Sequence, residues 1–216
     1  MRSTPTSVAP SWLLLACVLL LPAACVLPGG ADTAASTKSN APSSVSGVYT
    51  PAVPTSHRPF TTFHASWKMR MSAGYAYLEH RGHYHDARSM VSTVVREAEA
   101  QGLTIDGPPF VLFYDDPAQK PVSELVARVA LPIAGQRSPA APLRYDVLPE
   151  ANVAYAAVSG PYPAVPEAYP HLDAYLQRFN WELAGPIREI YVVPPSSVRT
   201  TDELLCEVQF PVATRR

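Results

Sequence analysis

Residues 185–194 read GPIREIYVVP, and residues 107–116, 78 positions earlier, read GPPFVLFYDD. Both stretches open with Gly-Pro and continue with β-branched and aromatic residues, a pattern typical of a strand that follows a turn. Other identities recur at the same offset of 78: Ala76-Tyr77 with Ala154-Tyr155, Gly82 with Gly160, and Tyr84 with Tyr162. After one inserted residue, Leu131-Pro132-Ile133 matches Phe210-Pro211-Val212. The sequence therefore predicts two copies of one structural unit.

Each copy is expected to contain a strand, a helix and two further strands, in repeats spanning 60–133 and 143–213. Apolar residues at helical spacing predict helices near 87–98 and 168–179. The residues expected to face the core are Ala87, Met90, Val91, Val94 and Ala98 in the first helix and Ala168, Leu172, Tyr175, Leu176 and Phe179 in the second. Alternating or apolar runs predict the last two strands of each copy, at 110–114 and 125–131 and at 187–193 and 204–210. The expected fold is α+β. It consists of two pseudo-twofold-related strand-helix-strand-strand repeats, with helices on one face of the sheets and a groove between the copies on the other.

Composition excludes several classes of protein. The chain has 216 residues, with 17 basic and 18 acidic side chains, so it lacks the basic surplus of a nucleic-acid-binding protein. Three cysteines are too few for a disulfide-stapled scaffold. The 24 prolines make up 24/216, or 11%, about twice the usual share near 5%. Nucleic acid is therefore not an expected partner.

The N-terminal residues 1–24 have the pattern of an export signal. Arg2 is followed by an apolar run from 12 to 21, and LPAAC at 21–25 resembles a bacterial lipobox. We expect cleavage before Cys25, whose lipidation would anchor the protein in a membrane. Alternatives are plain secretion after cleavage behind Ala31, and an uncleaved anchor. Val26 after the cysteine favours the outer membrane, by resemblance to lipoprotein sorting rules. The expected location is the cell envelope, on the outer membrane or the periplasmic side, or otherwise secreted or periplasmic.

Residues 25–59 are predicted to be a flexible linker. Of the 29 residues from 31 to 59, 19 are Ala, Ser, Thr or Pro and three are charged, so this segment has little apolar surface to bury. The folded domain is expected to span 60–216.

Strand alternation sorts the side chains of the second copy. In the last strand, Cys206, Val208, Phe210 and Val212 are expected in the core, with Glu207 and Gln209 on the opposite face. In the strand before it, Ile190 and Val192 are expected to face inward. Glu189 and Tyr191 would then share one surface with Glu207 and Gln209. Such acids beside aromatic rings suit a cationic or planar ligand. The alternative is that each acid pairs with an arginine such as Arg188, Arg199 or Arg128.

The Gly-Pro strand at 185–192 and the closing EVQFPV at 207–212, preceded by Ala154-Tyr155 and Gly160-Pro161-Tyr162, resemble the GyrI-like effector-binding domain. This is also the small-molecule-binding domain of AraC-type and MerR-type regulators. The resemblance covers roughly 60–214. It implies a central groove for hydrophobic or cationic molecules, with Glu207 as counter-charge, Glu189 as a second acid, and Tyr191, Tyr155 and Trp181 as walls. Because residues 1–59 are expected to be a leader and a linker, the regulators' helix-turn-helix is not expected in them.

Other functions are open. Some members of the resembled family are hydrolases of reactive small molecules, and the related SOUL proteins bind haem. Catalysis here would need Glu207 or Glu189 as a general base with a tyrosine as donor, and no catalytic motif is present, so an enzyme is not the preferred interpretation. His80, His83 and His85 could in principle hold zinc or haem iron. Their close spacing in the first copy alone favours exposed polar residues. No cofactor or metal is expected, and Cys206 is expected to be a buried, inert thiol.

Overall fold

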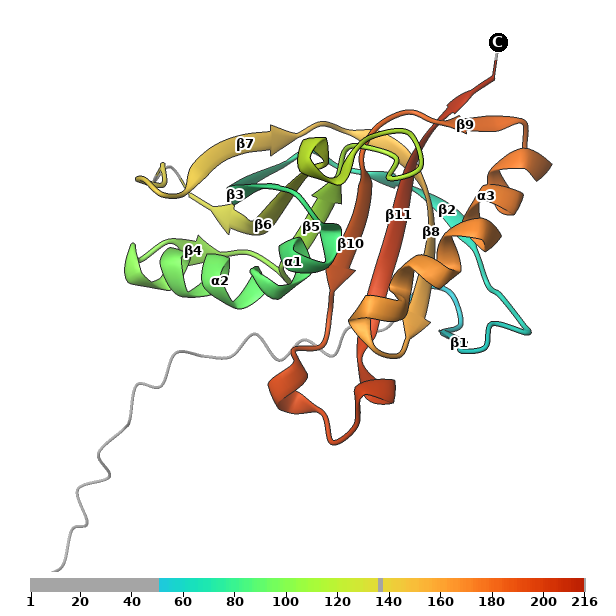
Figure 1. Ribbon diagram of the computed structural model, residues 1–216, viewed down its shortest axis with the longest axis horizontal. Helices are drawn as coiled ribbons and strands as arrows, with labels where there is room; N and C mark the ends of the chain where they lie inside the picture. Colours follow the sequence, from blue (N-terminus) through green and yellow to red (C-terminus); the bar gives the residue numbers. More distant parts are fainter. Residues whose placement is uncertain (1–50, 136–137, 216) are drawn as a thin grey trace, which may run out of the picture. The chain divides into compact units, whose positions relative to one another are not determined.

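The computed structural model describes residues 51–135 and 138–215, and within them the protein is an α+β domain built on one large, mostly antiparallel sheet (Figure 1). The strands run in the order β1-β8-β11-β10-β5-β6-β3-β7. Three more strands lie off this path and pair with its strands: β2 with β8, β4 with β6 and β9 with β11. Only β1 pairs in parallel among these strands.

The first half of the domain contains the elements from β2 to β6. Its strands and helices are β2 (Ser66–Arg70), β3 (Ala73–Arg81), α1 (Tyr84–Ser89), α2 (Val91–Ala100), β4 (Thr104–Ile105), β5 (Phe110–Phe113) and β6 (Val126–Ala134). The helix predicted near 87–98 is broken at Met90 into α1 and α2. Its expected core residues Ala87, Val94 and Ala98 are fully buried, which confirms the helical spacing.

The second half contains the elements from β7 to β11. These are β7 (Arg144–Leu148), β8 (Ala151–Ser159), the 3₁₀ segment η2 (Tyr162–Ala168), α3 (Tyr169–Arg178), β9 (Trp181–Leu183), β10 (Ile187–Tyr191) and β11 (Leu205–Thr214). Leu172 and Leu176, one turn apart on α3, are buried against the sheet. Short 3₁₀ turns also precede the last strand of each half, η1 (Val122–Glu124) before β6 and η3 (Pro195–Ser197) and η4 (Thr201–Glu203) before β11.

Several contacts occur in both halves at the sequence offset. The glycines after β3 and β8, Gly82 and Gly160, both have positive φ and donate a backbone hydrogen bond at 3.0 Å, to Leu125 and Leu204. A left-handed conformation suits glycine at such a turn. The first strand of each half pairs with the other half, because β2 pairs with β8 and β7 pairs with β3. The two halves are therefore joined by exchanged edge strands as well as by β5 and β10.

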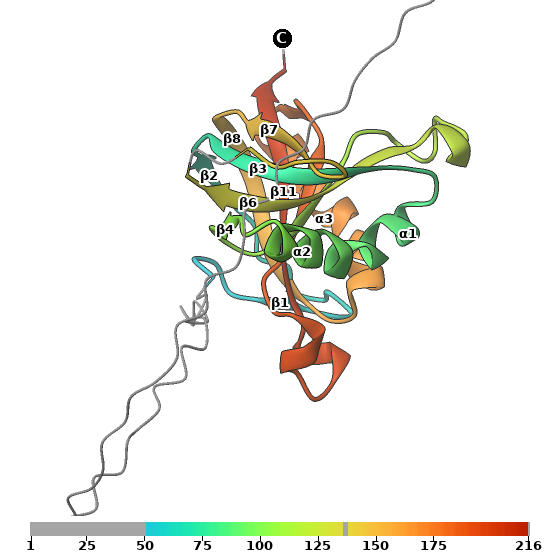
Figure 2. The same cartoon turned by 90° about the vertical axis from the view of Figure 1, so that its left-hand side faces the viewer.

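All three α-helices pack on one face of the sheet. Their buried residues belong to a single cluster with apolar side chains of β5, β6, β8 and β11, such as Val111, Val129, Ala156 and Val208. Figure 2 shows β3, β6 and β7 crossing above α1 and α2. We call this side of the sheet the helix-covered face. Two smaller clusters on the other side hold no α-helical residue among those described, and that side is called the helix-free face.

The folded part begins earlier than predicted. Ser56 and His57, placed in the linker by the sequence, form β1 along β8. Val53 is buried beside Tyr155 and Ala157, and Ser56 Oγ accepts a hydrogen bond from the His64 amide at 2.9 Å. By pairing with the sheet, the backbone N–H and C=O groups of β1 find hydrogen-bond partners in the protein. The composition of this segment predicts a linker whose backbone is bonded to water. The predicted leader, Cys25 and most of the linker lie outside the described residues. No helix within 51–135 and 138–215 is long and apolar enough to cross a membrane.

Candidate functional site

The register between β10 and β11 determines which predicted site residues can meet. Tyr191 lies opposite Cys206 and Glu189 opposite Val208, whereas Ile190 lies opposite Glu207. Residues directly opposite in an antiparallel pair point to the same face. Glu189 and Tyr191 therefore lie on the helix-covered face, and Glu207 and Gln209 on the helix-free face. The prediction that these four share one surface is wrong, because a strand register one residue different reverses every side chain.

Glu189 forms the centre of a fully bonded polar cluster inside the helix-covered face. Its side chain is completely buried, and both oxygens accept two hydrogen bonds each. Arg88 of α1 donates to both oxygens at 2.9 and 2.6 Å. Tyr169 of α3 and Tyr191 of β10 each donate at 2.6 Å. This cluster links α1, β10 and α3. For Glu189 the alternative of arginine pairing is therefore correct, although its partner is Arg88.

Burial and the charge of Glu189 raise the pKa of Tyr169 and of Tyr191 well above 10. Burial also raises the pKa of the Cys206 thiol, which lies on the same face and is 1% exposed. The expectation that Cys206 is buried is confirmed. For Arg88, burial lowers the pKa, but the hydrogen bonds and charge of Glu189 outweigh it, so the pKa is raised.

Glu207 lies on the helix-free face within a second polar group. Its side chain is 3% exposed and forms an ion pair with Lys68 of β2 at 2.6 Å. Gln209 Nε2 also donates to Glu207 Oε1 at 2.6 Å. The Lys68 ammonium lies 4.1 Å from the centroid of the Tyr155 ring. The structure thus brings together two predicted site residues, Glu207 and Tyr155, and adds Lys68 between them.

A second ion pair beside a tyrosine ring lies at the matching positions of β6 and β7. There the cation is on β6, whereas in the first pair the strand that matches β6, β11, carries the anion. Arg128 of β6 pairs with Asp146 of β7 at 2.5 Å and lies 4.4 Å from the Tyr77 ring centroid. Tyr77 and Tyr155 are 78 residues apart, as are Lys68 and Asp146. One tyrosine ring in each half is therefore covered by the cation of an ion pair, and both cations come from the first half.

Two more arginines lie on the helix-free face. Arg188 of β10, in register with Gln209, stacks over Phe110 with its guanidinium carbon 3.9 Å from the ring centroid. Arg70, at the end of β2, is 9% exposed and donates to the Pro149 carbonyl at 3.0 Å. Sequence reasoning missed Lys68 and Arg70 as site residues. The alternation of Ser66, Lys68 and Arg70 in β2 is the signal that could have found them, because it places three polar side chains on one face.

Trp181 lies apart from the acids, at the edge of the helix-covered face. It packs edge-on against Trp67 at 6.4 Å and stacks with Phe179 at 5.2 Å. These rings border a hollow of about 290 Å³, lined by Trp67, Asn152, Trp181 and residues 212–214. Trp181 is thus the wall of a surface hollow, but it does not face Glu207.

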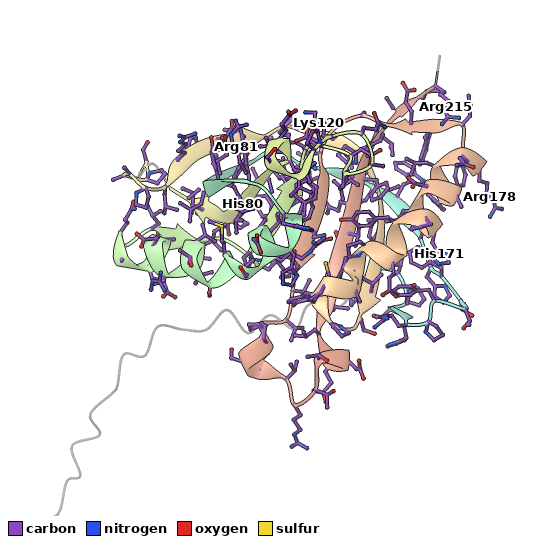
Figure 3. All side chains as sticks on the ribbon, in the orientation of Figure 1. His80, Arg81, Lys120, His171, Arg178 and Arg215 are labelled. Carbon is purple, nitrogen blue, oxygen red and sulfur yellow. The ribbon has the colours of Figure 1, made fainter. Side chains whose placement is uncertain are left out.

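The histidines of the first copy do not converge. His83 and His85 are exposed, and His80 Nε2 is 3.1 Å from the His83 carbonyl. Figure 3 shows His80 and His171 on well-separated parts of the domain; His171 stacks on Phe63 at 4.8 Å. Within the described ranges, no three His, Cys, Asp or Glu side chains come together as a metal site would require.

The Glu189 cluster generates a stability prediction. Glu189→Gln removes the charge that balances Arg88, whose side chain is 12% exposed, so we expect a loss of about 3–5 kcal/mol in the free energy of unfolding. Glu167→Gln is a matched control, because Arg58 binds that glutamate with the same two-bond geometry at the surface, where about 0–1 kcal/mol is expected. Urea unfolding measures both. Equal losses in the two variants would contradict a structural role for the buried cluster.

The raised tyrosine pKa values generate a pH prediction. In the unfolded chain a tyrosine loses its proton near pH 10, whereas folded Tyr169 and Tyr191 retain theirs. The folded state then holds more protons, so its stability falls as pH rises above about 10, by about 1.4 kcal/mol per pH unit for each such group. Urea unfolding at pH 8 and pH 11 should show a smaller decline for Tyr191→Phe than for the wild type. Tyr145→Phe, at an exposed position, should decline like the wild type; the reverse order would refute the explanation.

The fold resembles several solved structures. The crystal structure of the EcmrR C-terminal domain superimposes with a TM-score of 0.63 at 17% identity, covering 71% of this chain and 99% of that domain. A cryo-EM structure of EcmrR in a DNA complex gives the same TM-score and identity, and the match covers 70% of this chain but 57% of that one. An uncharacterised conserved protein from Listeria innocua has a TM-score of 0.52 at 9% identity, covering 69% and 92% of the two chains.

Sequence comparison agrees with the fold. Among proteins of curated function, none is similar in sequence to this chain. The model of one family, the GyrI-like small molecule binding domain, matches residues 75–213, which include all strands from β4 to β10 and Glu207 of β11. The chain therefore belongs to the GyrI-like small-molecule-binding family.

Proposed function

We propose that the protein binds a small molecule with an aromatic or apolar body on the helix-free face, next to Glu207, and that it does so at the cell envelope. We choose the helix-free face because of one observation. Glu207, Gln209 and Arg188 occupy central strands where apolar packing would be more stable. Apolar side chains normally fill the middle of a sheet. Polar residues in such positions are expected where a function requires them.

The aromatic residues of this face supply the apolar part of the site. Tyr75, Tyr77, Phe110 and Tyr155 are all at most 6% exposed, and Tyr75 lies 5.5 Å from Phe110, ring to ring. Lys68 and Arg128 cover two of these rings. The Lys68 side chain is 38% exposed and has a long, flexible stem. A ligand ring can therefore reach Tyr155 when Lys68 shifts off that ring and keeps its ion pair with Glu207, which exchanges one contact with the ring for another.

Lys68 also affects the expected charge of the ligand. Its ammonium lies where a cationic ligand would approach Glu207 Oε1. A cation must replace an ion pair that already exists, so it gains less from Glu207 than it would from a carboxylate with no cation beside it. The role of Glu207 as counter-charge stays a prediction, and Lys68 is its intramolecular competitor.

We further propose that the two halves are related by a pseudo-twofold axis. The matched glycine hydrogen bonds, the exchanged strands β2 and β7, and the two tyrosine-covering ion pairs support this relation. A ligand on the helix-free face would then lie near the junction of β5 and β10, where the halves meet.

The binding proposal is tested with three probes that share one ring system: naphthalene-2-carboxylate, naphthalene-2-carboxamide and 2-naphthylmethylammonium. Titration calorimetry on the full-length protein should detect at least one of them. A ligand at a hundredfold excess over its dissociation constant should also raise the free energy of unfolding by about 2.7 kcal/mol. Tyr155→Ala should weaken binding, whereas Trp181→Ala should leave it unchanged. The absence of binding by all three probes, or sensitivity to Trp181 alone, would reject this face.

The envelope proposal rests on the sequence of residues 1–25 and is tested separately. Wild-type protein expressed in a two-membrane bacterium should sediment with membranes and incorporate labelled palmitate. Cys25→Ser should abolish the label and release the protein, because the acyl chains provide the anchor. Cys206→Ser is the control and should keep both properties. Label retained in Cys25→Ser would exclude lipidation at that residue.

A further inference from the structure

Two arginines on the helix-free face have hydrogen-bonding groups that the protein does not use. Arg70 is 9% exposed, and only its NH2 group, bound to Pro149, is bonded; Nε and NH1 have no acceptor within residues 51–135 and 138–215. Arg188 Nε likewise has no acceptor among the described residues. Buried polar atoms are nearly always hydrogen-bonded in folded proteins. Three unused donor nitrogens on two guanidinium groups of the same face therefore require an explanation.

The positive charge of these arginines is also not balanced by an ion pair. Glu207 pairs with Lys68 and Asp146 pairs with Arg128, whereas no ion pair of Arg70 or Arg188 occurs in the described part of the chain. Burial, followed by the charge of Arg70, lowers the pKa of Arg188 to about 9, and the attraction of Glu207 only partly opposes this. The charges of the two guanidinium groups therefore repel each other.

Among the described residues, Arg88 has the carboxylate acceptor that Arg70 and Arg188 lack. Arg88 is buried to a similar degree on the other face, and Glu189 accepts two of its hydrogen bonds there. Arg70 and Arg188 have the same planar donor groups without such an acceptor. A carboxylate has two oxygens that match a guanidinium fork, and its charge would offset the repulsion between the two arginines.

We propose that Arg70 and Arg188 bind an anionic carboxylate group of the ligand, so that the molecule taken up by this domain is an aromatic or apolar carboxylate. This inference rests on the proposed binding face and names the chemical class of its ligand. The Arg188 guanidinium, stacked on Phe110 beneath it, places the anion next to the aromatic layer. Lys68 remains on Glu207, which keeps the acid from repelling the carboxylate.

The same naphthalene series separates this inference from the binding proposal. With full-length protein, naphthalene-2-carboxylate should bind at least about tenfold more tightly than naphthalene-2-carboxamide, as expected for charge-assisted hydrogen bonds. The ammonium probe should bind most weakly. Arg70→Met and Arg188→Met should each remove the preference for the carboxylate while leaving carboxamide affinity within about twofold of the wild type. Arg96→Met, an exposed position on α2, is the matched control and should keep the preference.

The unliganded variants provide a second readout. Because Arg70 holds a buried charge without an ion-pair partner, Arg70→Met should unfold at the same or a higher urea concentration than the wild type. Equal binding of carboxylate and carboxamide by the wild type would overturn the anion site while leaving the binding face intact. A preference for the ammonium probe would overturn it in favour of Glu207. Destabilisation by both methionine variants, with the carboxylate preference retained, would assign the arginines a structural role.

Discussion

The antiparallel register of β10 against β11 is the constraint on which the chemistry of this protein depends. Side chains alternate between the faces of a sheet, so the pairing of Ile190 with Glu207 also places Glu189 on the opposite side. Two glutamates that are close in the sequence of the second half thereby enter different environments. One is enclosed under helices with four hydrogen bonds, and the other lies on the face where α-helices do not pack.

The two faces of the sheet differ in how completely their buried polar groups are hydrogen-bonded. On the helix-covered face, Arg88, Tyr169 and Tyr191 donate two hydrogen bonds to each oxygen of Glu189, so the cluster acts as a cross-link between α1, β10 and α3. On the helix-free face, Arg70 and Arg188 retain unused donors. A completed network stabilises one packing arrangement, whereas an incomplete one is costly until a partner supplies the missing acceptors. The incomplete face is the one suited to a ligand.

Several features could be predicted from the sequence because they are local or periodic. The offset of 78 located the glycine turns at Gly82 and Gly160, and helical spacing identified Val94, Ala98 and Leu172 as core residues. Alternation within β11 correctly separated Val208 from Glu207. The pairing of β10 with β11 could not be derived in the same way. The loop between them includes two 3₁₀ turns, η3 and η4, whose residues carry no signal for the register.

The sequence by itself determined the family and the identity of the acids, because these depend on residue types at fixed spacing. Only the tertiary structure decided which charges meet. Lys68 reaches Glu207 across 139 positions, and Arg88 reaches Glu189 across 101, through an exchanged edge strand and a helix that packs from the other half. Such contacts depend on how strands and helices assemble in space, and no local pattern encodes a distance between segments so far apart in the chain.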